Sequence, residues 1–430
     1  MGGAWQSHGA PFDPRSAPGA SYRIRKANRS LLWSLAPNAL GQSTFGIKGT
    51  EPIGGSFSFV FAVDAGFDPY SFRLANGPGS AAANAGVPLN QQTAWADSSR
   101  AGQWYNGQGY LGVSSPTYGT LTVFRQNALT QDSVVDYDPM GASFAFSPVQ
   151  GMTSGVGDTE DARFSTSLKY QVKLGHFRMA ALWQFGGYAQ NNAANGAHQF
   201  QAGAEIPTLG KGALSIDAIY SYVKDAVSTS LGSGSNDSNG IPIPPFLPQT
   251  LTARISDNSS VMLLAKYAIG PLKLYGGYER IRFAAPSDPQ AAFTNIAGTF
   301  VCEGCAAINN TNINNTAFGV DGLGDRIRQV MWTGAKYAIT EKLDVMAAYY
   351  HYAQNSYFGT ATGGPAPCSG SEHSQCAGTF DAISGVVDWL FAPKWDLYLG
   401  IMSTQVNGGP ANGYLQRNNI ATTAGLRLRF

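Results

Sequence analysis

The sequence predicts an all-β protein, a single antiparallel β-barrel of about sixteen strands that crosses a membrane. Three observations support this fold class. Charged residues make up only 13% of the 430 residues, about half the usual share. Aromatic residues reach 12% and glycines number 52, yet the mean hydropathy of −0.13 is close to neutral. Polar and apolar residues also alternate over many short stretches, as they do in strands with one oily and one wet face.

No apolar run approaches the roughly 18 residues that a membrane-spanning helix requires, so the sequence excludes helical spans. The net charge of +1 gives no argument for nucleic acid, and we expect no such partner. Residues 1–40 show neither the apolar core nor the cleavage site of a secretory signal. We expect 1–40 to be an N-terminal segment whose structure the sequence does not define, and 41–430 to be the barrel domain.

From Ser43 onward the chain repeats one unit: two alternating strands joined by a short turn, followed by a long connection. The stretch 56–65 shows the alternation clearly, because its odd positions from Phe57 to Val63 are apolar whereas Ser58 and Asp64 share the other face. Short turns at one rim and long loops at the other are typical of bacterial membrane barrels. The expected strands are 43–50, 56–65, 103–113, 119–125, 163–172, 177–187, 198–206, 213–224, 257–269, 272–283, 329–339, 343–353, 379–390, 395–404 and 421–430.

These are fifteen strands, and single-chain bacterial barrels have an even number. One further strand is therefore expected before Ser43, although residues 22–35 fit the strand pattern poorly.

A long polar segment, 127–162, connects two strands that carry Arg125 and Arg163. We expect it to fold into the mouth of a water-filled barrel and to place acidic side chains opposite basic ones on the wall. The candidate acids are Asp132, Asp136 and Asp138, with Asp158, Glu160 and Asp161 as alternatives nearer the return strand. The alternative interpretation is a solvated surface loop whose acids have no role.

The four cysteines, Cys302, Cys305, Cys368 and Cys376, all lie in polar loop sequence. Disulfides are the expected state, with 302–305 and 368–376 as the simplest of three possible pairings. A zinc site that uses all four thiolates is the alternative, but one C-x2-C motif without a second is a weak signal.

We expect neither a catalytic residue nor a cofactor nor a bound metal. The five histidines give no pair at the close spacing of metal ligands, and the acids at strand ends lack a calcium-site spacing. Many serines are present, but nothing in the sequence selects one for a Ser-His-acid arrangement.

Four short motifs carry a resemblance to a known family. Residues 43–49 read Ser-Thr-Phe-Gly-Ile-Lys-Gly, 109–115 read Gly-Tyr-Leu-Gly-Val-Ser-Ser, 118–126 read Tyr-Gly-Thr-Leu-Thr-Val-Phe-Arg-Gln, and 425–430 read Gly-Leu-Arg-Leu-Arg-Phe. In this order they resemble the general diffusion porins of Gram-negative outer membranes, in particular the α-proteobacterial type. The resemblance covers roughly residues 40–430.

The resemblance implies a sixteen-stranded homotrimer in the outer membrane, surrounded by lipid and lipopolysaccharide. In that family the third extracellular loop narrows the pore, and its acids face wall arginines, to which Arg125 and Arg163 correspond. A third arginine is replaced by Thr44, and Lys48 on the same face is its expected substitute. Phe430 corresponds to the terminal aromatic residue recognised during barrel insertion.

The expected function is passive diffusion of small hydrophilic solutes and ions through a charged constriction, without enzymatic activity. A substrate-selective channel is the alternative of the same class. An outer-membrane enzyme or adhesin that uses the long loops 284–328 and 354–378 is the alternative of a different class.

Overall fold

The fold was analysed in a computed structural model. It describes residues 2–6, 32–36, 38–67, 69, 107–151, 163–185, 196–208, 212–230, 252–284, 299–300, 308–309, 325–356, 377–409 and 417–429. The predictions for the four cysteines, for Asp158, Glu160 and Asp161, and for Phe430 concern residues outside these ranges.

Seventeen strands form one sheet, and all of its pairings are antiparallel. The predicted all-β antiparallel fold is thus confirmed. The strands are β1 (Gly2–Gln6), β2 (Leu32–Ala36), β3 (Thr44–Gly54), β4 (Phe57–Gly66), β5 (Gly109–Ser115), β6 (Gly119–Asn127), β7 (Arg163–Leu174), β8 (Phe177–Gln184), β9 (Ala197–Pro207), β10 (Ala213–Ser230), β11 (Thr252–Ile269), β12 (Leu272–Ala284), β15 (Arg326–Thr340), β16 (Leu343–Gln354), β17 (Gly378–Ala392), β18 (Trp395–Gly408) and β19 (Asn418–Leu428).

Outside this sheet, β13 (Thr299–Phe300) pairs with β14 (Ile308–Asn309). The two helices of the described chain are α2 (Leu129–Tyr137) and α3 (Pro148–Gly151). Neither is long and apolar enough to span a membrane.

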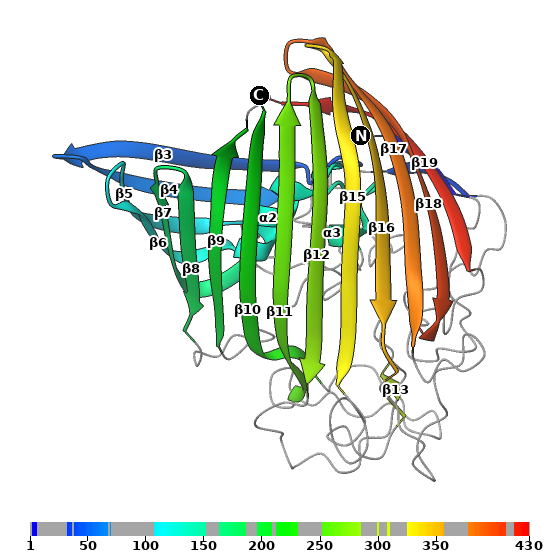
Figure 1. Ribbon diagram of the computed structural model, residues 1–430, viewed down its shortest axis with the longest axis horizontal. Coiled ribbons are helices and arrows are strands. Elements are labelled where there is room, and N and C mark those ends of the chain that lie inside the picture. The colour runs from blue at the N-terminus through cyan, green and yellow to red at the C-terminus, as the bar shows by residue number, and fades with distance from the viewer. Residues whose placement is uncertain are drawn as a thin grey trace.

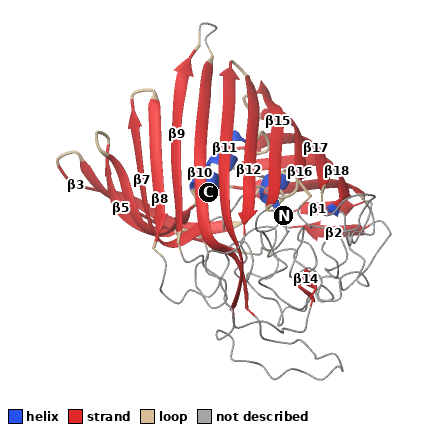
Figure 2. Cartoon of the chain, turned by 60° about the horizontal axis from the view of Figure 1, so that its bottom comes forward, coloured by secondary structure: helices blue, strands red, loops and turns tan. Residues whose placement is uncertain are grey.

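Neighbours in the sheet follow the chain order. Strands β3 to β12 pair in sequence, β12 pairs with β15, and the order continues to β19. Strand β1 then lies between β19 and β2. The two end strands of this path are therefore β2 and β3, which are consecutive in the chain. The sheet curves around α2 and α3, which lie on its concave side (Figures 1 and 2).

All fifteen expected strands are present, as β3 to β12 and β15 to β19. Instead of one strand before Ser43 there are two, β1 and β2, with Trp5 and Trp33 opposite each other and their ring centroids 6.4 Å apart. Each has only five residues, which is too short for an alternating pattern to stand out from chance.

Several strands extend further than expected at the rim that carries the long loops. Strand β10 continues to Ser230, β11 begins at Thr252 and β15 begins at Arg326. Polar residues outnumber apolar ones in these extensions, so they lack the run of apolar residues on one face on which the sequence prediction depends. At the other rim the turns are tight, and Gly175 and Gly270 adopt positive φ values of 62° and 53° in them.

Alternating exposure identifies the two faces of the sheet. In β18, Leu397, Leu399 and Ile401 are exposed on the outer face, whereas Asp396 and Tyr398 are buried on the inner, concave face. Apolar side chains exposed along the outer face are what a lipid-facing wall requires.

The sequence predicted a wet inner face, but the inner face of the sheet is not uniformly polar. Between β8 and β18 it carries a broad apolar surface, and the loop that contains α2 and α3 packs on it. The loop contributes Leu129, Val134, Tyr137, Met140, Phe146 and Val149, and the wall contributes Leu182, Ile219, Met262, Leu264, Ile281, Val330, Trp332, Tyr350, Ala382, Val386 and Tyr398. A buried apolar contact of this size fixes the loop inside the sheet.

Candidate channel constriction

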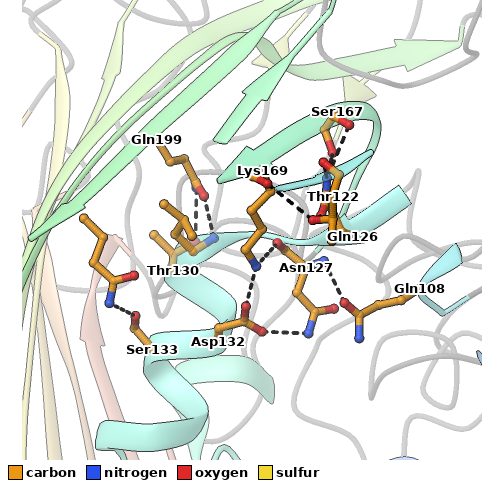
Figure 3. A network of polar contacts seen from close by, with 12 residues as sticks. Gln108, Thr122, Gln126, Asn127, Thr130, Asp132, Ser133, Ser167, Lys169 and Gln199 are labelled. Carbon is orange, nitrogen blue, oxygen red and sulfur yellow. Dashed lines mark hydrogen bonds and ion pairs between the residues drawn. The ribbon is translucent and has the colours of Figure 1, made fainter. Parts of the chain in front are cut away.

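The loop leaves β6 at Asn127, and a cluster of polar contacts holds its first turn (Figure 3). Lys169, on the inner face of β7, lies 2.6 Å from a carboxylate oxygen of Asp132 and donates to the backbone oxygen of Asn127 at 3.1 Å. The Asn127 amide donates to the other oxygen of Asp132 at 2.8 Å. Lys169 is buried whereas Asp132 is partly exposed, so the wall supplies the fixed charge of this ion pair.

The start of α2 is capped by the barrel wall. Ala128 occupies the N-cap position and has no side chain that could accept a hydrogen bond. Gln199 on β9 performs this role, because its side-chain oxygen accepts the backbone N–H of Leu129 at 2.6 Å. The first N–H groups of a helix have no partner within the helix, so this contact satisfies one of them and fixes the helix on the wall.

Replacing Lys169 with methionine is expected to loosen the first turn of α2 without unfolding the barrel. Because Asp132 is partly exposed, its carboxylate regains water, and we expect a cost of about 1–2 kcal/mol. Amide hydrogen exchange over residues 128–134 should then accelerate by about tenfold. Lys173→Met, on the same face of β7 in a more exposed pair with Glu205, is the control. Identical exchange in wild type and Lys169→Met would contradict the role of Lys169.

The end of α2 is anchored to β15 and β16. The Trp332 indole donates to the backbone oxygen of Tyr137 at 3.0 Å. Asp138, only 2% exposed, accepts the Tyr350 hydroxyl at 2.6 Å and the backbone N–H of Ala142 at 2.7 Å. Burial raises the pKa of the Asp138 carboxyl, and the hydrogen bonds from Tyr350 and Ala142 oppose that rise. Asp138 thus lies in the anchor of the loop and not on an open surface.

A second ion pair on the inner face spans three strands. Arg178 on β8 and Asp217 on β10 meet above Gly203 of the intervening β9, with Nη2 and Oδ2 2.6 Å apart and Nε and Oδ1 2.9 Å apart. They can meet because Gly203 has no side chain: a Cβ there would lie 1.7 Å from Asp217 Oδ1. Arg178 also donates to the Tyr137 hydroxyl, which joins this pair to α2.

Gly203→Ala is expected to separate Arg178 from Asp217 and to destabilise the barrel. Overpacking costs about 1–3 kcal/mol, and the broken pair adds to it. The measurement is the temperature at which the purified protein changes from the folded to the unfolded band on a detergent gel. Gly385→Ala is the control, because a Cβ at Gly385 has no neighbour within 4 Å. Equal transition temperatures for the two variants would show that the space above Gly203 is not required.

One acidic residue of the loop, Asp136, is mostly exposed. The Asp136 side chain is 74% exposed, and its nearest described cation is Lys266 on the inner face of β11, with Nζ and Oδ1 3.9 Å apart. Lys266 also donates to the Asp136 backbone oxygen at 3.3 Å and lies 5.1 Å from the centre of the Tyr137 ring. A carboxylate on the loop and an ammonium on the wall thus lie side by side within the barrel.

The basic residues predicted from the sequence, Arg125, Arg163 and Lys48, lie on β6, β7 and β3. Arg125 is buried near the end of β6 and donates to the Gly107 backbone oxygen and to Ser165. Arg163 begins β7 and pairs with Asn127 in the register, so both arginines flank the root of the loop. Lys48 is exposed on β3.

Sequence reasoning missed the cations that contact the loop. Lys169, Arg178 and Lys266 lie inside strands, at inward positions of the alternation. A charged residue at a wet position of an alternating strand is the signal that could have identified them. The sequence prediction instead selected Arg125 and Arg163 as wall cations, because they lie at the strand ends nearest the loop.

The sequence pattern of the family described as Gram-negative porin matches residues 27–409, which is most of the chain. The chain belongs to the Gram-negative porin family. It is therefore an outer-membrane β-barrel that forms a diffusion channel and not an enzyme, as expected. A search of the curated proteins finds no match to the sequence.

Solved porin structures share the fold. The anion-selective porin from Comamonas acidovorans is 13% identical, with a TM-score of 0.58 over 100% of this chain and 96% of that one. In-vitro folded OmpT of Vibrio cholerae is 13% identical, with a TM-score of 0.52 over 100% and 95%. The trimer form of OmpT is 15% identical, with a TM-score of 0.50 over 90% and 92%.

Proposed function

We propose that this porin passes small hydrophilic solutes and ions through a constriction formed by the loop 127–162, whose described residues 127–151 fold inward, and the facing wall. Asp132 and Asp136 supply the carboxylates of the loop. Lys169, Lys266 and Arg178 supply the cations of the wall. The observation that carries this proposal is the exposed Asp136 beside Lys266, on a helix that is anchored at both ends.

The Asp136–Lys266 pair serves the channel and not its stability. An ion pair in which one partner is mostly exposed contributes less than about 1 kcal/mol, so folding does not depend on it. Opposite charges that line the same water-filled path instead orient water and dipolar solutes, and they disfavour apolar molecules that cannot replace the lost hydration. The charges therefore select for hydrophilic solutes.

The basic residues expected from the sequence keep a proposed role at the edge of this constriction. Arg125 and Arg163 flank the root of the loop, and Lys48 adds a cation on β3. Guanidinium groups suit such a position because they stay charged in any surroundings. Phe430 as insertion signal, the cysteine pairs as disulfides, and the α-proteobacterial type also remain proposals, based on sequence alone.

We further propose that the chain forms a homotrimer embedded in outer-membrane lipid and lipopolysaccharide. Support comes from the family and from OmpT of Vibrio cholerae, a protein with the same fold that is described in a trimer form.

Reconstitution into planar bilayers tests the proposed function. We expect large, stable conductance steps in groups of three and a small reversal potential under a tenfold salt gradient, because the constriction carries charges of both signs. A current blocked by one solute at micromolar concentration would instead indicate the substrate-selective channel. The absence of any current from folded protein would contradict both.

A further inference from the structure

Two glycines on the inner face of the wall lie directly against the loop that contains α2 and α3. Gly334 on β15 and Gly400 on β18 occupy inward positions of the alternation. A Cβ at Gly334 would lie 2.6 Å from Cγ of Pro139, and a Cβ at Gly400 would lie 2.5 Å from Cε1 of Phe146. Carbon atoms in ordinary contact are about 3.5–4.0 Å apart. At these two points the loop therefore approaches the wall more closely than a residue with a side chain permits.

The close contact at Gly400 involves side chains alone. The three atoms nearest to a Cβ there are Cε1 and Cζ of Phe146 and Cγ2 of Val386 on β17, at 2.5, 2.6 and 2.8 Å. At Gly334 the nearest atom is instead the backbone oxygen of Ala347, at 2.3 Å, so a side chain there also disturbs the sheet. Gly400 is therefore the position at which the loop itself limits the size of the wall residue.

Phe146 is confined where it meets Gly400. Its side chain is fully buried, and its ring stands edge-on to Tyr398 with the ring centroids 6.5 Å apart. The backbone N–H of Ala145 donates to the Ala39 oxygen at 3.0 Å, and the Ala39 N–H donates to the Tyr398 hydroxyl at 2.9 Å. Because a close-packed contact leaves little room for sideways movement, a methyl group at Gly400 is expected to push the ring away from the wall.

Movement away from the wall carries the loop toward the interior of the barrel, where α2 and α3 lie on the concave side of the sheet (Figure 2). Phe144 and Ala145 are partly exposed and Gly141 is exposed, whereas Phe146 is buried. One side of this stretch thus packs on the wall and the other borders open space. A shift of about 1 Å restores ordinary contact at Gly400, and it narrows the remaining opening by a similar distance.

We propose that Gly400, together with Gly334, determines the size limit of the channel, because the missing side chain lets Phe146 lie against the wall and keeps the loop out of the open space. The inference rests on the proposed function, since it requires the loop to form the constriction, and it adds the wall residues that set the width. Gly400 is a positioning residue that acts on solutes only through Phe146. It carries no charge, so it affects the size of the solutes that pass and not their charge.

The test is a double-mutant cycle on the unit conductance in planar bilayers. We expect Gly400→Ala to lower the conductance by about a quarter to a half, since ion flow depends on the pore diameter, and to leave the reversal potential unchanged. Phe146→Leu lacks the two ring carbons nearest to Gly400, and in this background the same alanine should change the conductance by less than about a tenth. Gly385→Ala on β17 is the control, because a Cβ there has no neighbour within 4 Å, and it should conduct like wild type.

An equal loss of conductance with and without the Phe146 ring would overturn the proposal, and so would wild-type conductance from folded Gly400→Ala. If Gly400→Ala folds only together with Phe146→Leu, the ring and the added methyl group compete for one space, which supports the proposal. If neither protein folds, the strand itself rejects alanine and the proposal is wrong.

Asp138→Ala, which removes a polar anchor of the same loop, separates this inference from the proposed function. A changed conductance in Asp138→Ala with an unchanged one in Gly400→Ala would mean that the loop forms the constriction but that Gly400 does not set its width. Unchanged conductance in both variants would contradict the constriction itself.

Discussion

Asp138→Ala is expected to release the constriction loop from the wall and to raise the unit conductance of the channel. The substitution leaves the Tyr350 hydroxyl and the Ala142 N–H without their buried acceptor. Each buried donor without a partner costs about 1–3 kcal/mol, so the anchor is weakened by about 2–6 kcal/mol. Since α2 stays attached through Lys169 and Gln199 at its other end, we expect frequent fluctuations of the loop and not an unfolded barrel.

Single-channel recording measures this effect as a higher mean current with more current noise. Glu341→Ala is the control, because it removes an exposed carboxylate in the tight turn between β15 and β16, outside the constriction. Quiet recordings of unchanged amplitude from Asp138→Ala would show that Asp138 does not hold the loop.

Lys266→Glu is expected to shift the ion preference of the channel strongly toward cations. The variant places a second carboxylate beside the exposed Asp136, where wild type has an ammonium 3.9 Å away. Both groups then attract cations into the proposed constriction and repel anions. Under a tenfold salt gradient the reversal potential should move toward the cation limit by a sizeable part of the ~59 mV that a perfectly selective channel gives.

The control for this charge reversal is Lys342→Glu, which makes the same change in an exposed periplasmic turn. It should leave the reversal potential close to the wild-type value, because a charge in open solution is screened within about 10 Å. A shift of equal size in the two variants would mean that overall charge, and not the position of Lys266, sets the preference.

The transmembrane strands were predictable because membrane and water impose the alternation directly. Leu397, Leu399 and Ile401 must face lipid, and their neighbours must not, so the period of two is visible without any knowledge of the fold. The strand extensions near Ser230 and Arg326 lie toward the rim that carries the long loops, where polar residues outnumber apolar ones. The pattern therefore ends before the strand does.

The candidate site was predicted less well, because its contacts join residues that are far apart in the chain. That segment 127–162 would carry acids opposite basic wall residues followed from its composition. Nothing local indicated that Asp138 would meet Tyr350, or that Gly203 would leave space for Arg178 to reach Asp217. The apolar packing of the loop was also hidden, since Trp332 and Tyr350 read equally well as ordinary strand residues.

The central claim is that a water-filled barrel is narrowed by its own loop, and the size limit for neutral solutes tests it most directly. Proteoliposomes that contain the wild-type protein should swell in small sugars and not in large oligosaccharides, and those with Asp138→Ala should admit larger sugars than wild type. The same size limit in both proteins, or no entry of even the smallest sugar, would contradict the account.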